Sequence, residues 1–390
     1  MSGLDPTQVP LTLYIHLPWC VRKCPYCDFN SHEANGALPE AAYVDALLRD
    51  LDEELALGES RPLQAIFIGG GTPSLFSGAA ITRLLNGVRA RLALVPDAEI
   101  TLEANPGAVD EAHFAQYRQA GVNRLSIGVQ SLRAAQLQAL GRIHTPGDVT
   151  RAVAAARAAG FENFNLDLMH GLPGDVAGDA LNDLAAALEF GPTHLSWYQL
   201  TLEEGTAFAR RPPVLPDEDL TAVDFEAGCA LLAAAGFQRY EVSAWSLPGR
   251  ESRHNLNYWT FGDYLAIGAG AHGKRTRAGY IERSLKRRHP QAYMKAPLDE
   301  RRTVPKSELV MEFVINAFRL QGGFEREIFV QRTGLPWAAL APQIEEACAR
   351  GWLWERAGKL GPTPTGFAFL NDLQLLFMPT DDDPSLRNGN

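Results

Sequence analysis

Three of the five cysteines in this chain lie within eight positions, in the stretch WCVRKCPYCDFNSH. Cys20, Cys24 and Cys27 follow a Cys-x3-Cys-x2-Cys spacing on one predicted loop, so their thiolates can converge on one metal centre. An odd count with this crowding is a poor disulfide framework and a good metal signature. Cys229 and Cys348 stand alone in apolar helical runs, where a small buried thiol needs no function.

Two kinds of metal centre fit three thiolates on one loop. A closed structural zinc site needs four ligands in a tetrahedron, and the fourth would come from a neighbouring His or Asp side chain. Such side chains occur at His16, Asp28 and His32. A [4Fe-4S] cluster held by three thiolates instead leaves one iron with an open coordination position, where another molecule can bind. The cysteine spacing favours the cluster and leaves zinc open.

Composition narrows the class of protein. With 390 residues, 46% of them hydrophobic, the chain can bury a full core and form one large domain plus one or two smaller ones. A net charge of −10 argues against a broad nucleic-acid surface, so we expect no nucleic-acid partner. No apolar run approaches a membrane span, and the amino terminus MSGLDPTQVP has no signal-peptide pattern. We therefore expect a cytoplasmic protein.

The elements that would position the cysteines follow a repeating order. From residue 11 to about residue 245, short apolar and β-branched runs alternate with longer helical runs, which predicts parallel β/α units. We expect an α/β fold, a (β/α) barrel that is complete or partial, with its chemistry at the carboxyl ends of the strands. The predicted strands are TLYIHL, QAIFIGG, EITLEA, RLSIGV, FNLDLM, HLSWYQL and, less regular, RYEVSA.

Polar or glycine-rich motifs follow five of these strands. The cysteine loop comes after the first strand, and GGGTP, EANPG, GVQS and DLMHGLPG follow the second to the fifth. Each motif alone has an ordinary explanation, since a triple glycine also suits a tight strand-to-helix turn. Because the ends of parallel strands meet at one mouth, their convergence predicts a single functional site.

The chain divides into four predicted parts. Residues 1–245 form the barrel, and residues 246–300 form a linking segment with HNLNYW and a basic stretch from Lys274 to Arg288. Residues 301–380 read as three short helices, a hairpin and a last helix, which is a winged-helix-like α+β order. Acidic residues are interspersed throughout this part, which argues against DNA binding. Residues 381–390 are expected to be a disordered tail.

The stretch LYIHLPWCVRKCPYCDF resembles the signature of the radical S-adenosylmethionine (SAM) superfamily. The resemblance implies a partial (β/α)6-type barrel. It also implies that Cys20, Cys24 and Cys27 ligate a site-differentiated [4Fe-4S] cluster, and that SAM chelates the fourth iron through its amino and carboxylate groups. In that family the cluster supplies an electron that can cleave a carbon–sulfur bond of SAM, which is chemistry of the cofactor and not of side chains.

The same resemblance implies a set of residues that line the SAM pocket. The glycines among them would let the backbone approach a ligand, and Arg142 would offer a fork of donors to a carboxylate. Glu103 could accept a hydrogen bond from an ammonium or a ribose hydroxyl. The set comprises Tyr14, Tyr26, Gly70, Gly71, Thr72, Glu103, Gln130, Arg142 and Asp167.

Within the superfamily, the chain resembles the group of the oxygen-independent coproporphyrinogen III oxidases and the haem chaperones of the HemW type. The motifs YIHLPWC, GGGTPSL, EANPG, SIGVQS, GRIHT and DLMHGLPG carry this resemblance. The oxidases have a further cysteine two residues after the third and a longer amino-terminal extension. This chain has Phe29 at that position and 19 residues before Cys20, which favours the chaperones.

The stretch HNLNYW matches the His-Asn-x-x-Tyr-Trp motif of the chaperone branch, which implies that His254 binds haem. An imidazole can ligate haem iron, and Tyr258 and Trp259 offer flat apolar surface. The alternative is that His254 caps a turn and the aromatic residues are core.

We therefore expect a haem chaperone with a [4Fe-4S] cluster, SAM and haem, and no catalytic side chain is assigned. The alternative is an oxygen-independent coproporphyrinogen III oxidase. The expected partners are a haem donor and respiratory haemoprotein recipients, with homodimer formation and peripheral membrane association as further expectations. The basic stretch could meet haem propionates or an anionic membrane, although a solvated loop is the simpler interpretation.

Overall fold

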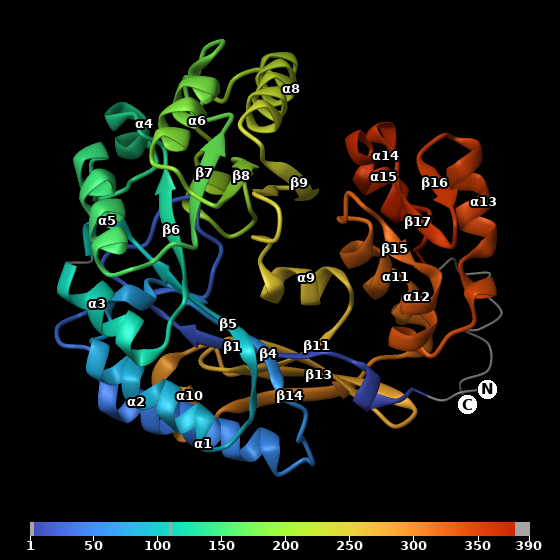
Figure 1. The fold of residues 1–390 in the computed structure, drawn as a ribbon, viewed down its shortest axis with the longest axis horizontal. Helices are drawn as coiled ribbons and strands as arrows, with labels where there is room; N and C mark the ends of the chain where they lie inside the picture. Colours follow the sequence, from blue (N-terminus) through green and yellow to red (C-terminus); the bar gives the residue numbers. More distant parts are fainter. Residues whose placement is uncertain (1–3, 109–110, 379–390) are drawn as a thin grey trace.

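The computed structural model describes residues 4–108 and 111–378 (Figure 1). Its main sheet has a parallel centre made of apolar, β-branched runs, which suit strands covered on both faces. In their order across the sheet, these strands are β11 (Asp263–Ile267), β1 (Leu11–Leu17), β4 (Leu63–Gly70), β5 (Leu94–Ala104), β6 (Arg124–Gln130), β7 (Phe164–His170) and β8 (His194–Gln199).

Antiparallel strands extend the sheet at both ends. Beyond β8 lie β10 (Ala244–Ser246) and β9 (Gln238–Glu241), and beyond β11 lie β12 (His272–Arg277), β13 (Tyr280–Lys286) and β14 (Leu298–Thr303). Among the described residues β9 and β14 are the two ends of the order and do not pair with each other, so the barrel is open. This confirms the predicted fold class of a partial barrel.

The last predicted strand, RYEVSA, differs from the expectation. It forms β9 and the start of β10, which are antiparallel to each other, and β10 is antiparallel to β8. Only Val242 and Ser243 separate β9 from β10, and so short a connection cannot cross over to a parallel neighbour. This part is therefore a ribbon and not another β/α unit.

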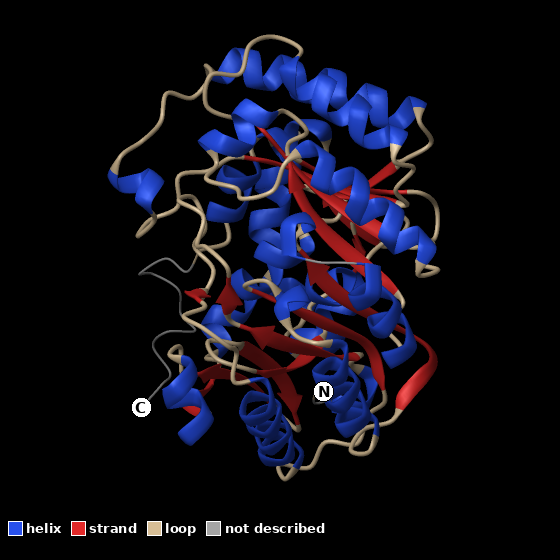
Figure 2. Cartoon of the chain, turned by 90° about the vertical axis from the view of Figure 1, so that its left-hand side faces the viewer, coloured by secondary structure: helices blue, strands red, loops and turns tan. Residues whose placement is uncertain are grey.

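Helices that connect the strands cover the outer face of the sheet (Figures 1 and 2). Their apolar residues recur at helical spacing; α2, for example, buries Ile81, Leu84, Leu85 and Val88 against the sheet. The helices of this layer are α1 (Glu40–Leu55), α2 (Gly78–Arg89), α3 (Glu111–Ala120), α4 (Ala134–Ala139), α5 (Pro146–Ala158), α6 (Asp179–Glu189) and α8 (Glu218–Ala234). Shorter elements are β2 (Trp19–Cys20), β3 (His32–Glu33), α7 (Ala207–Arg210), η1 (Pro6–Gln8), η2 (Pro73–Leu75) and η3 (Pro106–Ala108).

Residues 246–300, expected to link two domains, build part of the main sheet. They supply β11, which pairs in parallel with β1, together with β12, β13 and the start of β14. They also form α9 (Arg253–Trp259) and α10 (Pro290–Lys295). Figure 1 shows α9 between the sheet and the carboxyl-terminal part of the chain.

The carboxyl-terminal part has a hydrophobic core of its own, centred on Phe313, Phe324 and Phe329. Its three helices, small sheet and final helices match the predicted winged-helix-like order. The elements are α11 (Lys306–Ala317), β15 (Phe324–Glu325), α12 (Arg326–Thr333), η4 (Trp337–Ala339), α13 (Ala341–Ala349), β16 (Leu353–Arg356), β17 (Lys359–Pro362), α14 (Pro364–Ala368) and α15 (Leu370–Leu375). The tail predicted for residues 381–390 lies outside the described residues.

In the described part of the chain, no helix is both long and apolar enough to cross a membrane.

Candidate functional site

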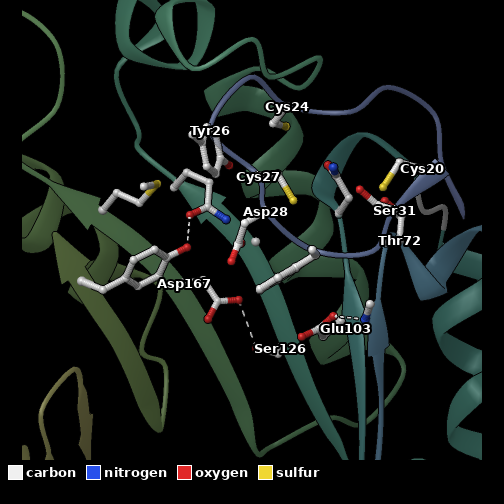
Figure 3. Close-up of a pocket in the computed structure, with 18 of the residues that line it drawn as sticks. Cys20, Cys24, Tyr26, Cys27, Asp28, Ser31, Thr72, Glu103, Ser126 and Asp167 are labelled. Atoms are coloured by element: carbon white, nitrogen blue, oxygen red, sulfur yellow. Dashed lines mark hydrogen bonds between the residues drawn. The ribbon is translucent and has the colours of Figure 1, made fainter. Parts of the chain in front are cut away.

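One cavity of about 550 Å³ opens at the carboxyl ends of the parallel strands (Figure 3). This volume is typical of a site for a small molecule or cofactor. Eleven of the thirteen predicted site residues line it. These are Cys20, Cys24, Tyr26, Cys27, Gly70, Gly71, Thr72, Glu103, Gln130, Arg142 and Asp167.

The loop that carries the cysteines is held by backbone interactions. β2, which includes Cys20, pairs with β3, and the Cys27 N–H donates to the Cys24 carbonyl over 3.2 Å. The side chain of Asn30 donates to the carbonyls of Ala269 and Arg288, over 2.9 and 2.8 Å. The loop after β1 is thus fixed to two segments, one after β11, its neighbour in the sheet, and one after β13.

Cys20, Cys24 and Cys27 all line this cavity. Figure 3 shows Cys20 beside Thr72, and Cys24 and Cys27 nearer Tyr26. Burial raises the pKa of the thiols of Cys20 and Cys27, so both are protonated at neutral pH until a metal displaces the protons.

Two of the three side chains proposed as a fourth zinc ligand, those of His16 and His32, already have hydrogen-bond partners, whereas the third, Asp28, lines the cavity. His16 is hydrogen-bonded at one ring nitrogen to the Tyr14 hydroxyl over 2.9 Å, and at the other to the Asn30 carbonyl over 2.8 Å. The nitrogen Nε2 of His32 lies 3.3 Å from the Arg288 carbonyl. Within residues 4–108 and 111–378, no three His, Cys, Asp or Glu side chains are arranged to hold a single metal ion.

The glycines after β4 permit a close approach of two backbone segments. A Cβ atom at Gly71 would lie 2.5 Å from the carbonyl oxygen of Trp19, and Gly70 has a φ of +120°. The N–H of Thr72 donates to the same Trp19 carbonyl over 2.7 Å. GGGTP therefore fixes the second strand end directly against the cysteine loop, which requires glycine for steric reasons.

Two carboxyl groups lie at the ends of β5 and β7. Burial, followed by the nearby charge of Asp167, raises the pKa of Glu103 to about 8, although the Gly70 N–H donates to it over 3.0 Å. Burial also raises the pKa of Asp167, which accepts a hydrogen bond from Ser126 over 3.1 Å. Glu103 is therefore mostly neutral at pH 7, and a bound cation would favour its charged form.

Arg142 and Gln130 complete the strand-end side. The guanidinium of Arg142 donates to the Gly128 carbonyl over 2.7 Å and to the sulfur of Cys24 over 3.6 Å, and its buried Nε has no partner among the described residues. Gln130 has a φ of +68° and accepts from the Tyr198 hydroxyl over 2.7 Å. Gln130 is the last residue of β6, and its left-handed backbone conformation changes the direction of its side chain, which lines the cavity.

Tyr14 and His254 are the two predicted residues that do not line the cavity. His254 is 1% exposed, and its ring packs on those of Phe67 and Tyr14 with centroid distances of 5.1 and 6.2 Å. Its Nε2 is hydrogen-bonded to the Tyr258 hydroxyl over 2.9 Å, and its Nδ1 is buried without a partner among the described residues. Burial lowers the pKa of His254 to about 3, so the ring is neutral.

Sequence reasoning missed several cavity residues. Ser126 and Tyr198 lie on strands that were predicted, and Tyr198 could have been found because it lies near the end of β8. Ser243, Asn255 and Arg319 come from three segments outside the strand-end motifs. Asn255 could have been found because it is the second residue of HNLNYW, whereas nothing local in the sequence marks Ser243 or Arg319.

The basic stretch is not a solvated loop, so that interpretation is wrong. It forms β12 and β13, and Lys274 and Lys286 are each 1% exposed, paired with Asp263 and Asp50. Further ion pairs join Arg275 to Glu54 and Glu59, Arg277 to Glu282, Arg283 to Glu312, and Lys286 to Glu54. Of the basic residues in this stretch, Arg287 and Arg288 are the two that are exposed to solvent.

Comparison with known proteins agrees with the site's geometry. Residues 14–186 match the model of the Radical SAM superfamily, and residues 304–369 match that of the HemN C-terminal domain. The solved structure of coproporphyrinogen III oxidase (HemN) from Escherichia coli is similar, with a TM-score of 0.79 at 22% identity, covering 95% of this chain and 90% of that one. At this identity the likeness shows the fold.

Curated relatives are much closer in sequence. Heme chaperone HemW of Escherichia coli is 53% identical over 95% of this chain and 98% of its own length. Heme chaperone HemW of Haemophilus influenzae is 48% identical, over 96% of this chain and 99% of its own. With similarity at this level over nearly the whole length of both chains, this chain belongs to the HemW family of the radical SAM superfamily.

Proposed function

We propose that this chain is a haem chaperone that binds haem and delivers it to respiratory enzymes, and that it carries a [4Fe-4S] cluster and SAM. The observation that carries the proposal is the 53% identity to a heme chaperone over 95% of the chain. The identities of donor and recipients, homodimer formation, contact with a membrane surface and a cytoplasmic location stay predictions.

The donor set of the cavity suits the cluster and SAM. Cys20, Cys24 and Cys27 would hold the cluster, which together with SAM supplies one-electron chemistry at a carbon–sulfur bond. Arg142 keeps the Cys24 side of the loop in place through its hydrogen bonds, and its unpartnered Nε leaves a donor. Glu103 offers a carboxyl group that an amino group could ionise.

His254 meets the chemical requirement for a haem ligand. Its imidazole is neutral, and its Nδ1 has no competing hydrogen bond within the described residues. Because the side chain is 1% exposed, haem iron can reach it only after α9 or Tyr258 moves. We therefore expect binding at His254 to be slower than the first encounter with haem.

The experiment uses the full chain, reconstituted anaerobically with iron and sulfide and then titrated with haemin, with absorbance as the readout. We expect one haem per chain in the wild type and at least tenfold weaker binding in His254→Ala. His170→Ala is the matched control, because His170 is also buried with an unpartnered Nδ1 and packs on an aromatic ring, that of Trp197. Equal haem binding by both variants would contradict the assignment of His254.

The oxidase alternative is tested on the same preparation. Coproporphyrinogen III, SAM and a reductant are added, and protoporphyrinogen IX is measured. The chaperone proposal predicts no product, and Phe29 is consistent with this because it occupies the position of the oxidases' further cysteine. Sustained decarboxylation by the wild type would overturn the proposal.

A further inference from the structure

We propose that Ser243, Asn255 and Arg319 form a carboxylate subsite in the cavity wall and that its ligand is a propionate of haem. The inference rests on the proposed haem binding and goes beyond it by naming how the cargo is held. The three residues line the same cavity as the cysteines, but they come from the ribbon between β9 and β10, from α9 and from the segment after α11.

Helix α9 directs two neighbouring side chains of the HNLNYW motif to different surroundings. Neighbouring residues on a helix point about 100° apart, so His254 and Asn255 face different surroundings. His254 packs on Phe67 and Tyr14, whereas Asn255 lines the cavity. The side-chain amide of Asn255 makes no hydrogen bond to the described residues. In the HNLNYW motif it is therefore the asparagine that is available to a molecule in the cavity.

Arg319 is held in a fixed position by its neighbours. Its Nε and Nη2 both donate to one oxygen of Glu241, over 3.1 and 2.8 Å, and its guanidinium lies 4.3 Å from the centre of the Trp259 ring. Glu241 is itself 4% exposed and accepts from the Ser243 N–H over 3.0 Å. The arginine is thus held in place before any ligand arrives.

This arrangement leaves donor capacity on Arg319. A guanidinium has five N–H donors, and Nη1 of Arg319 has no hydrogen bond to the described residues. Two other arginines line the cavity: Arg22, on the cysteine loop, and Arg142, on the strand-end side, which already donates to the Gly128 carbonyl and to Cys24. A planar guanidinium recognises carboxylates better than other anions of comparable size because its donors match the two oxygens.

The ligand class follows from these donors. Arg319, the amide of Asn255 and the hydroxyl of Ser243 would all donate to a carboxylate, and the hydroxyl of Ser243 makes no hydrogen bond to the described residues. Haem carries two propionates on a flat apolar body. A propionate held here would place the body of haem in the cavity, next to the helix that carries His254.

The test compares haemin with its dimethyl ester, which has the same iron and ring but no free carboxylate. Both are titrated into the full chain, reconstituted anaerobically with iron and sulfide, under the same solvent conditions. We expect the wild type to bind haemin about tenfold more tightly than the ester, the effect of one charge-assisted hydrogen bond. In Arg319→Gln the two affinities should become equal through loss of haemin affinity alone.

Two further variants sharpen the test. Asn255→Asp places a negative charge in the cavity wall with little change of shape. It should weaken the binding of haemin but not that of the ester. Arg350→Gln is the matched control, because Arg350 also pairs with a glutamate, Glu346, and lies 4.9 Å from a tryptophan ring, but does not line the cavity. Arg350→Gln should therefore bind haemin more tightly than the ester, as the wild type does.

The outcomes separate this inference from the proposed function. If the wild type binds haemin and the ester equally well, the subsite is wrong and the proposed haem binding stands. If the wild type binds neither ligand, both the subsite and the proposed haem binding are wrong. If Arg319→Gln weakens the binding of both ligands by the same factor, Arg319 only stabilises the fold of the cavity wall, and the subsite is wrong. If Arg319→Gln fails to fold, as judged by thermal unfolding, Asn255→Asp decides.

Discussion

The strand-end side of the cavity and the α9 side are held by different kinds of interaction. At the strand ends, backbone meets backbone: the Thr72 N–H donates to the Trp19 carbonyl, and Gly71 leaves no room for a side chain. At α9, a helix of seven residues is held largely by side chains; for example, Asn257 donates to the Asp263 carbonyl and His254 packs on Phe67. Backbone contacts permit few alternative arrangements, whereas side chains can change rotamer.

This difference suits the two proposed occupants. A cluster and SAM that stay bound need a rigid wall, whereas a cargo that must enter and leave needs a wall that can rearrange. The following changes test whether the strand-end side is rigid and the α9 side adaptable.

The largest effect is expected from Cys24→Ala. Loss of one of three thiolates should reduce the bound iron and sulfide of the reconstituted protein to near zero. Cys348→Ala is the control, since Cys348 lies on α13 and outside the cavity. Iron and sulfide content, measured by colorimetric assay, checks the prediction; wild-type content in Cys24→Ala would show that the cysteine loop is not the cluster site.

Gly71→Ala should cost about 2–3 kcal/mol of unfolding free energy, because the new Cβ meets the Trp19 carbonyl oxygen at 2.5 Å and a backbone atom cannot move aside cheaply. In Gly322→Ala the new methyl meets nothing within 4 Å, so the change should stay within about 0.5 kcal/mol. Urea unfolding measures both. Equal stability of the two variants would mean that the strand-end side is less rigid than described.

Glu103→Gln should change the pH dependence of stability. The pKa of Glu103 in the folded protein is about 8, above its ordinary value of 4.5, so folding takes up a proton between these values. Stability of the wild type without SAM should therefore fall as pH rises from about 5 to about 8, and Glu103→Gln should lose this component.

Urea unfolding at several pH values measures the difference. Glu162→Gln, at an exposed position, should retain the wild-type slope. A slope in Glu103→Gln that matches the wild type would show that Glu103 is ionised in the folded protein.

The smallest effect is expected from Tyr258→Phe, which removes the hydrogen bond to Nε2 of His254. The loss should cost about 1 kcal/mol of unfolding free energy. If α9 must rearrange for haem to reach His254, this variant should also bind haemin faster in stopped-flow absorbance. Tyr280→Phe, at an exposed tyrosine, is the control. Slower binding in Tyr258→Phe would show that the tyrosine contacts haem and does not hold His254 away from it.

The sequence predicted the strand-end side well because strand ends obey a general rule. Once the apolar runs were read as parallel strands, the residues after them, such as Gly71 and Glu103, had to meet at one mouth. Tyr14 was placed in the cavity by resemblance. In the structure it lies within β1, where its hydroxyl is hydrogen-bonded to His16.

The α9 side could not be predicted in the same way. The motif HNLNYW identifies the helix but not which face packs on Phe67, and that depends on residues far apart in sequence. Arg319 reaches the cavity only because the carboxyl-terminal part packs beside Glu241. The sequence predicts a solvated loop for the basic stretch because the acidic partners of this stretch are not near it in sequence. Two of them, Asp50 and Glu54, lie more than 200 residues earlier.

The pairing of β1 between β4 and β11 has a consequence for biosynthesis. Asp263–Ile267 is made roughly 250 residues after β1, which at about 5–20 residues per second is on the order of 10–50 s of translation. Until then one edge of the first strand lacks its partner, and an unpaired edge invites association with other chains. The loop with Cys20, Cys24 and Cys27 follows directly on this strand, so the proposed cluster site cannot be fully enclosed until about two thirds of the chain has left the ribosome.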